Sequence, residues 1–189
     1  MNVLKGIKIG EYLVNSCTMY IEPVEYANKI YSHIVEVEEE FLSPFKPLQN
    51  IKNSCDYFGV DYESRRKGTR LLIDYSRRLP IVIEPINKIY AFCTASPGDP
   101  KSIWIFPAHV KDYRRVFARQ TLVIFRNNQS RIFPVSYSTF NTQMLRTSYL
   151  QTKLMQRVEF NNKKLFYLLH GPKSSTASES IEFYLEDRK

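Results

Sequence analysis

The segment from Ser138 to Val158 constrains the possible folds more than any other part of the chain. It contains neither proline nor glycine, and Ser138 is a residue type that caps helix N-termini well. With a rotation of 100° per residue, its apolar side chains share one face: Phe140, Met144, Leu154, Met155 and Val158. The spacing predicts one long amphipathic helix over residues 138–158, capped by Ser138.

Most of the remaining sequence favours strands. Thirteen tyrosines and twelve phenylalanines, with many valines and isoleucines, suit a half-buried pleated sheet. Residues 94–102 are the clearest loop, and residues 126–131 are expected to form a hairpin connection. Strands are predicted at 11–15, 18–24, 30–37, 69–76, 80–84, 88–94, 103–106, 120–125 and 131–135.

Shorter helices interrupt the strands. The apolar spacing is helical over residues 48–58, before Gly59. Asp61 is expected to cap a short helix over residues 62–67 that ends at Gly68, and a terminal helix is expected over 181–189. The order of strands, helices, strands and helix predicts an α+β fold with mixed or antiparallel strands.

The size and composition suit one domain, with 189 residues of which 43% are hydrophobic. No apolar run approaches the ~18–20 residues of a membrane span, and the N-terminus does not resemble a signal peptide. We therefore expect a cytoplasmic, nucleoid-associated protein without a membrane partner. Cys17, Cys55 and Cys93 are expected to be reduced thiols.

Charge is distributed unevenly along the chain. Residues 1–45 hold three lysines against seven glutamates, whereas residues 46–164 hold 21 Lys/Arg against eight Asp/Glu. Residues 165–189 hold three Lys/Arg against four Asp/Glu. The basic middle points to a polyanionic partner, and the alternative interpretation is a basic but inert surface.

Three segments concentrate the positive charge. The stretch YESRRKGTR, residues 62–70, has four cations, which either favour a helix C-terminus or bind a polyanion. Arg146, Lys153 and Arg157 fall within roughly 40° of one another on a helix. This stripe either faces phosphates, together with Thr142, Tyr149 and Thr152, or lies along the edge of the core. The third segment is HVKDYRRVFAR, residues 109–119, whose aromatic residues Tyr113 and Phe117 are expected in the core. Trp104, which apolar residues flank, is also expected to be buried.

Enzyme signatures are weak in this sequence. No phosphate-binding loop, dinucleotide fingerprint, zinc-protease motif or nucleophile elbow is present. Asp74, Glu84 and Lys88 faintly resemble the acidic pair and lysine of metal-dependent nucleases, which leaves a nucleic-acid-processing enzyme as an alternative. We expect no enzyme activity, no catalytic residues, no metal ligands and no cofactor.

A helix-turn-helix is a second alternative. Residues 48–58, the turn at 59–61 and the helix at 62–67 follow the order of that motif. A recognition helix ending at Gly68 would be short for deep docking in the major groove.

Many residues over positions 11–160 resemble the ComK family of bacterial competence transcription factors. The segments that carry the resemblance are 46–49, 54–55, 58–59, Tyr62, Arg65, 68–69, Trp104, 109–111, 136–137, Phe140, Gln143, 146–147, Leu150, 152–153 and Arg157. The resemblance implies an activator of DNA-uptake genes that binds paired AT-rich boxes mainly through the minor groove, as a dimer or tetramer. It also implies RNA polymerase as a partner, and the adaptor MecA, which delivers the protein to a Clp protease.

The resemblance and the charge together select candidate DNA contacts. Family-matching cations come first, and their neighbours follow: Arg65, Lys111, Arg146, Lys153 and Arg157, then Arg66, Lys67, Arg70 and Arg114. A-tracts narrow the minor groove and concentrate negative potential there, which attracts arginine.

The resemblance also places an adaptor-binding segment near the C-terminus. Its counterpart here is LFYLLHGPK, with Phe166, Tyr167, Leu168, Pro172 and Lys173 as the candidate contacts. Here three residues separate Leu168 from Pro172, which departs from the family pattern. We therefore expect a DNA-binding domain over 1–165, with an acidic β-rich part at 1–45 and a basic part at 46–164. The C-terminal tail, 166–189, is expected to be regulatory.

Overall fold

The computed structural model describes residues 6–170. The chain divides into two compact units, Met1–Lys153 and Leu154–Lys189. All strands and two of the helices of the described part belong to the first unit. The predicted α+β class is confirmed, whereas the helix expected at 181–189 lies outside the described residues.

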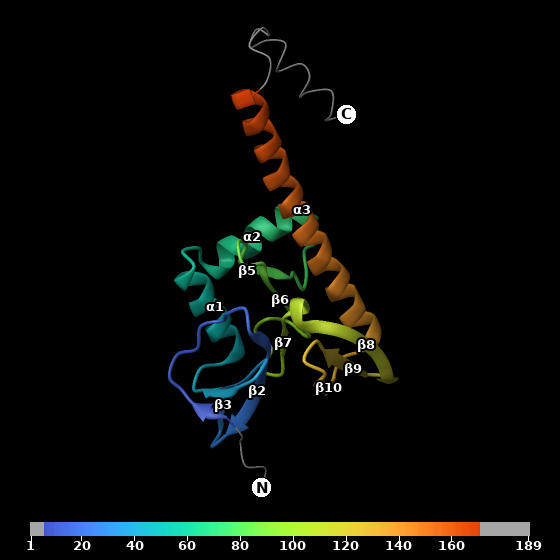
Figure 1. Cartoon of the computed structure of the whole chain (residues 1–189). Helices are drawn as coiled ribbons and strands as arrows, with labels where there is room; N and C mark the ends of the chain where they lie inside the picture. Colours follow the sequence, from blue (N-terminus) through green and yellow to red (C-terminus); the bar gives the residue numbers. More distant parts are fainter. Residues whose placement is uncertain (1–5, 171–189) are drawn as a thin grey trace. The chain divides into compact units, whose positions relative to one another are not determined.

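A seven-stranded mixed sheet forms the centre of the first unit (Figure 1). Its spatial order is β1-β4-β3-β2-β7-β6-β5, with β1 parallel to β4 and the other pairs antiparallel. The strands are β1 Ile7–Lys8, β2 Thr18–Tyr26, β3 Lys29–Glu36, β4 Glu40–Ser43, β5 Ile81–Glu84, β6 Ile89–Cys93 and β7 Trp104–Ile105.

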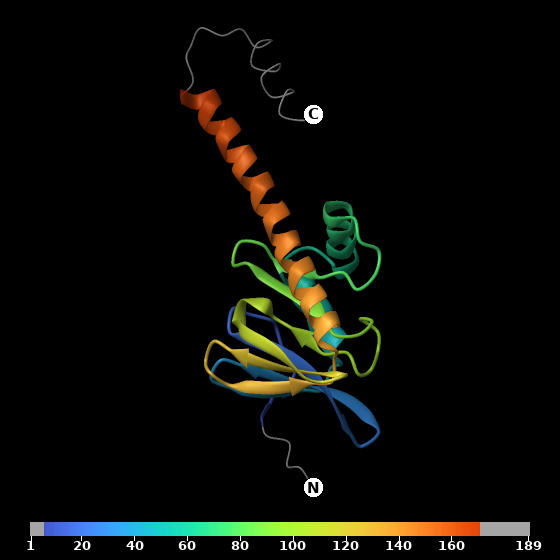
Figure 2. The same ribbon diagram turned by 90° about the vertical axis from the view of Figure 1, so that its right-hand side faces the viewer.

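A second, antiparallel sheet contains three strands, β8 Val110–Phe117, β9 Gln120–Phe125 and β10 Ser130–Phe133. A short 3₁₀ turn, η1 Pro107–His109, precedes it. The hairpin predicted at 126–131 is confirmed as the connection between β9 and β10. Figure 2 shows this sheet beside the first turns of α3, Tyr137–His170.

The seven-stranded sheet has a core on each face because side chains alternate along a strand. Trp104 packs on one face with Ile21 and Tyr62, and its neighbour Ile105 packs on the other with Phe140. The first face carries α1 Pro47–Tyr57 and α2 Tyr62–Ile73, and the second carries the three-stranded sheet and the start of α3. The burial expected for Trp104 is confirmed, since it is 0% exposed.

The prediction for α2 was wrong at its C-terminal end. Gly68 lies inside the helix, which continues through residues 69–73, where the sequence predicted a strand. Asp74 ends the helix in the left-handed conformation, and its backbone N–H donates to the carbonyl of Arg70. A glycine within a helix costs propensity, but here packing of Tyr62, Thr69 and Ile73 fixes the helix.

The long helix is confirmed over 138–158 and continues to His170. Ser136, rather than Ser138, is its cap, because the backbone N–H of Thr139 donates to Ser136 Oγ at 3.2 Å. Ser138 therefore lies within the first turn.

Two further predictions differ from the structure. Residues 11–15 are not a strand. Phe117, expected in the core, is 65% exposed at the end of β8.

No helix in the described part of the chain is long and apolar enough to span a membrane.

A charge cluster links the two sheets. His33 on β3 bonds Glu22 on β2 and Glu40 on β4, each at 3.0 Å, and Arg131 on β10 also pairs with Glu22 at 3.0 Å. The bond to Glu22 raises the pKa of His33 even though burial opposes this. Burial disfavours ionised Glu22, yet its bonds to His33 and Arg131 together lower its pKa.

We predict that Gly68→Ala stabilises the protein by about 0.5–1 kcal/mol, because alanine favours the helix interior. A Cβ at Gly68 would meet nothing within 4 Å. Urea denaturation measures the change. Gly59→Ala is the matched control: its site is equally open, but φ is +79°, so a loss of about 1 kcal/mol is expected. Destabilisation by Gly68→Ala would contradict the continuous helix.

We also predict that His33 makes the stability of the folded protein depend on pH. The pKa of His33 is higher in the folded protein than in the unfolded chain. The stabilisation that protonated His33 provides is therefore complete below about pH 6.5, and it is lost as the pH rises through the pKa of the folded state. Glu22 affects stability only at lower pH, where protonation of its carboxylate weakens its bonds to His33 and Arg131. Urea denaturation from pH 6 to 9 should therefore show a smaller loss of stability in His33→Gln than in the unaltered protein. Equal pH slopes would contradict this role.

Candidate nucleic-acid interface

α1 and α2 form a helix-turn-helix arrangement (Figure 1). The turn, residues 58–61, contains Gly59 with φ +79°. Asp61 caps α2 by accepting a hydrogen bond from the backbone N–H of Ser64 at 3.0 Å. With 12 residues, α2 has the length of a recognition helix, so the objection drawn from Gly68 no longer applies.

The four cations of α2 differ in availability. Lys67 and Arg70 are exposed, whereas Arg65 and Arg66 are half-buried. Arg66 Nη1 donates to Glu63 Oε2 at 3.3 Å. Arg65 lies beside α1, close enough to favour ionisation of the Cys55 thiol, although burial raises that pKa to about 12. Lys67 and Arg70 are therefore the cations of α2 most accessible to a large partner.

Arg146 connects α3 to the loop that follows α2. Its Nη1 donates to the carbonyl oxygen of Arg77 at 3.0 Å, and its guanidinium carbon lies 4.2 Å from the centre of the Tyr75 ring. The family-matching residue thus has a fixed position beside the segment 74–80. These contacts leave other N–H groups of the guanidinium for a ligand.

The same contacts bring together cations that the sequence reasoning missed. Arg77 and Arg78 are exposed in the loop between α2 and β5. Two adjacent arginines are visible in the sequence. The strand expected at 69–76 placed them after a strand, whereas in the structure they follow helix α2.

The other cations of the predicted stripe divide between the two units. Lys153 Nζ lies 5.3 Å from the Tyr149 ring centre and is half-buried. Arg157 belongs to the second unit and is exposed. The hydroxyls of Thr142 and Thr152 donate to helix carbonyls at 2.8 and 3.0 Å, so their protons are used within α3.

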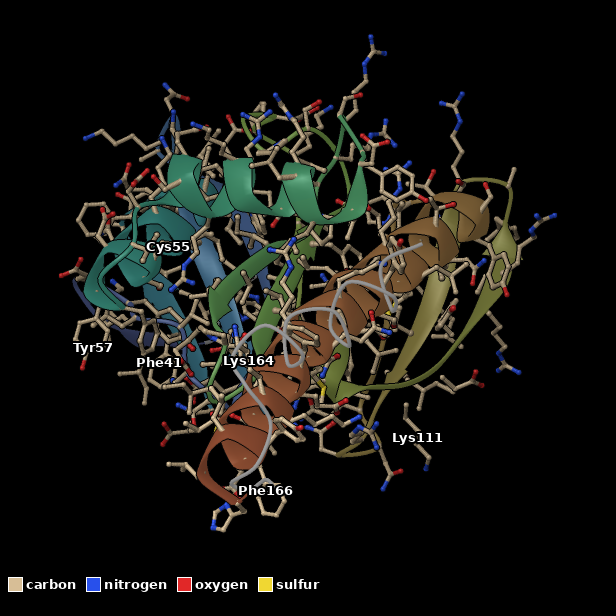
Figure 3. All side chains as sticks on the ribbon, turned by 90° about the horizontal axis from the view of Figure 1, so that it is seen from above. Phe41, Cys55, Tyr57, Lys111, Lys164 and Phe166 are labelled. Atoms are coloured by element: carbon tan, nitrogen blue, oxygen red, sulfur yellow. The ribbon has the colours of Figure 1, made fainter. Side chains whose placement is uncertain are left out.

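Strand β8 also packs against the first turns of α3. Tyr113 donates its hydroxyl proton to Asn141 Oδ1 at 2.7 Å, and its ring lies 5.0 Å from that of Phe140. This places Arg114 in a strand beside α3, with its side chain exposed. Lys111 Nζ donates to Asn128 Oδ1 at 3.1 Å, and Figure 3 shows its side chain at the outer edge of the three-stranded sheet.

The basic surface therefore comprises three segments of the first unit: residues 62–80, 110–117 and 137–153. Together they contain eleven Lys/Arg and three Asp/Glu. Contacts of Arg146 and Tyr113 join the other two segments to α3. Such a cluster attracts polyanions and favours their association.

The residues of the nuclease alternative have structural roles. Glu84 is buried, and its two carboxylate oxygens accept the backbone N–H groups of Ile86 and Asn87 at 2.8 and 2.5 Å. Asp74 ends α2, and Lys88 occupies a turn with φ +57°. Within residues 6–170 no group of three or more His, Cys, Asp or Glu could hold a metal ion. Cys55 and Cys93 are buried free thiols and Cys17 is an exposed one.

The candidate adaptor segment lies partly in the helical end of the second unit. Phe166 and Leu168 are 66% and 64% exposed, and Tyr167 is 38% exposed. Pro172 and Lys173 lie outside the described residues.

Comparisons with known proteins agree with the sequence resemblance. The model of the ComK protein family matches residues 9–159. The chain is 34% identical over 179 residues to a protein of Bacillus subtilis strain 168 named "Competence transcription factor", and the match covers 95% of this chain and 93% of that protein. No solved structure matches. A match of this extent, to a family of transcription factors rather than enzymes, shows that the chain belongs to the ComK family of competence transcription factors.

Proposed function

We propose that this protein activates competence genes by binding AT-rich paired boxes in promoter DNA, mainly through the minor groove, as a dimer or tetramer. The observation that carries the proposal is the basic surface, with eleven cations and three acids on segments joined to α3. DNA supplies a regular array of phosphates, whose neutralisation releases counterions and drives binding.

Arginine is well represented on this surface, and this supports minor-groove reading. A narrow A-tract groove concentrates negative potential, and a guanidinium that enters it displaces little hydration compared with an ammonium. Among the candidate arginines, the side chains of Arg70, Arg114 and Arg157 are exposed. Bending the DNA would let protomers reach both boxes, at an elastic cost of order 1–6 kcal/mol that further contacts offset.

The helix-turn-helix mode remains a second candidate because α2 is a full helix after a tight turn. In that mode α2 would lie in the major groove and Lys67 and Arg70 would contact bases or phosphates. The two modes share the basic surface and differ in the groove.

The proposed protein partners come from the family resemblance. We propose that RNA polymerase is a partner and that residues 166–173 meet the MecA adaptor, which would deliver the protein to a Clp protease in the cytoplasm. Phe166 and Leu168 expose the apolar surface that such a contact requires.

We predict that the affinity for a duplex with spaced A- and T-tracts falls with salt, with a slope of about −0.9 per phosphate contacted. Fluorescence anisotropy over a series of rising salt concentrations measures it. A GC-rich duplex of equal length should bind much more weakly. Equal affinity for both duplexes, or a flat salt response, would contradict the proposal.

Competition distinguishes the two grooves. Netropsin occupies the minor groove of A-tracts, so we expect it to displace the protein, whereas methyl green in the major groove should not. The opposite pattern would select the helix-turn-helix mode.

We further predict that Lys67→Ala with Arg70→Ala lowers the magnitude of the salt slope by about 0.9 for each phosphate that the variant no longer neutralises. The control is Lys29→Ala, an exposed lysine in the acidic part of the chain, which should leave the slope unchanged. An unchanged slope in the double variant would remove α2 from the interface.

A further inference from the structure

A polar hollow of about 280 Å³ lies between the α2–β5 loop and the first turns of α3. Its lining contains three arginines and no acidic residue. The residues are Arg77, Arg78, Ser138, Thr139, Thr142, Gln143 and Arg146. Three arginines and no acid around one small hollow raise the positive potential there, which favours an anion.

We propose that this hollow is a phosphate-binding site, and that in this protein it takes one backbone phosphate of bound DNA. The assignment of the phosphate to DNA rests on the proposed function. The phosphate chemistry itself rests on the residues that line the hollow.

Arg146 is held in place before any ligand binds. Its Nη1 donates to the Arg77 carbonyl at 3.0 Å and its guanidinium lies over Tyr75, so little side-chain entropy remains to be lost. Its Nε is buried and has no hydrogen-bond partner among the described residues. A buried N–H without an acceptor is costly, and a phosphate oxygen would satisfy it with a charge-assisted bond.

Gln143 adds an acceptor, unpaired within residues 6–170, to the lining of the hollow, so an anion bound there must reach this oxygen through a donor. The residue is only 1% exposed and its Nε2 donates to the Cys93 carbonyl at 3.1 Å, which orients the amide. Its Oε1 has no partner within the described residues. A phosphodiester cannot donate to this oxygen, but a water bound to the phosphate can bridge the two. A free phosphate that carries a proton can donate to it directly.

The start of α3 adds a favourable field. The N-terminus of this helix carries roughly half a positive charge, and hydroxyl groups accompany it. Ser136 gives its proton to Thr139 Oγ1 at 3.0 Å, which leaves the Thr139 proton for an acceptor in the hollow. The site therefore combines guanidinium, hydroxyl and helix-dipole contacts, the set that proteins use for phosphate.

The location favours a polymer over a free anion. Of the residues that line the hollow, Arg77, Arg78 and Ser138 are exposed to solvent, whereas Gln143 is buried. Exposed Arg70 lies at the end of the neighbouring helix α2. A strand of DNA can place one phosphate in the hollow while adjacent phosphates meet these cations.

The test uses the full chain with Arg77→Gln and Arg78→Gln combined. The carbonyl of Arg77, not its side chain, accepts from Arg146, so this variant should keep that link. The control combines Lys29→Gln and Lys101→Gln, which removes the same charge from exposed sites outside the hollow. Equal urea midpoints verify that the variants remain folded.

Two measurements follow. In anisotropy titrations with the tract duplex, the arginine variant should lower the magnitude of the salt slope by about 0.9 or more, and the control should not. In NMR titrations with inorganic phosphate alone, the Arg146 Nε–Hε resonance should shift saturably in the unaltered protein and much less in the arginine variant.

The outcomes separate the two claims. If the unaltered protein binds the duplex but the arginine variant has the same slope and the Arg146 resonance does not move, the phosphate site is wrong. If the resonance moves but the unaltered protein does not bind duplex DNA, the site binds free phosphate and the proposed function fails. If phosphate shifts the resonance in the unaltered protein, and the salt slope falls in the arginine variant but not in the control, both the phosphate site and the proposed function are supported.

Discussion

The alternation of side chains at β7 is the constraint on which the rest of the first unit depends. Trp104 is fully buried with α1 and α2 on one face of the sheet, and Ile105 is fully buried against the second core. Tyr62 packs edge-on against Trp104, with ring centres 6.3 Å apart, so the first turn of α2 is attached directly to the sheet. Truncating either aromatic side chain to alanine would cost about 3–5 kcal/mol through the cavity left behind.

The basic surface depends on these two cores. The first core holds α2 so that Lys67 and Arg70 remain on its exposed side, and the second holds α3 through Phe140. Arg146 and Tyr113 then connect α3 with the α2–β5 loop and with β8. Positive charge from distant parts of the sequence is thus gathered by packing, and the proposed DNA contacts depend on that packing.

The sequence predicted the elements whose periodicity is strong. The long helix over 138–158, the hairpin at 126–131 and the burial of Trp104 followed from spacing and residue type. Gly68 was misread because tertiary packing of Thr69 and Ile73 outweighs a propensity cost of about 1 kcal/mol. The side-chain proximity of Arg146 to Tyr75, and the hollow beside it, depend on long-range contacts that no local pattern encodes. The candidate contacts Arg65 and Arg66 differ in exposure from Lys67 for the same reason.

Hydrogen exchange of the full chain, with and without a duplex that carries spaced A- and T-tracts, tests the central claim most directly. The account predicts that DNA slows exchange in residues 62–80, 110–117 and 137–153, while the β2–β3 hairpin in the acidic part stays unchanged. Protection confined to the β2–β3 hairpin, or absent from all three basic segments under conditions of saturated binding, would contradict it.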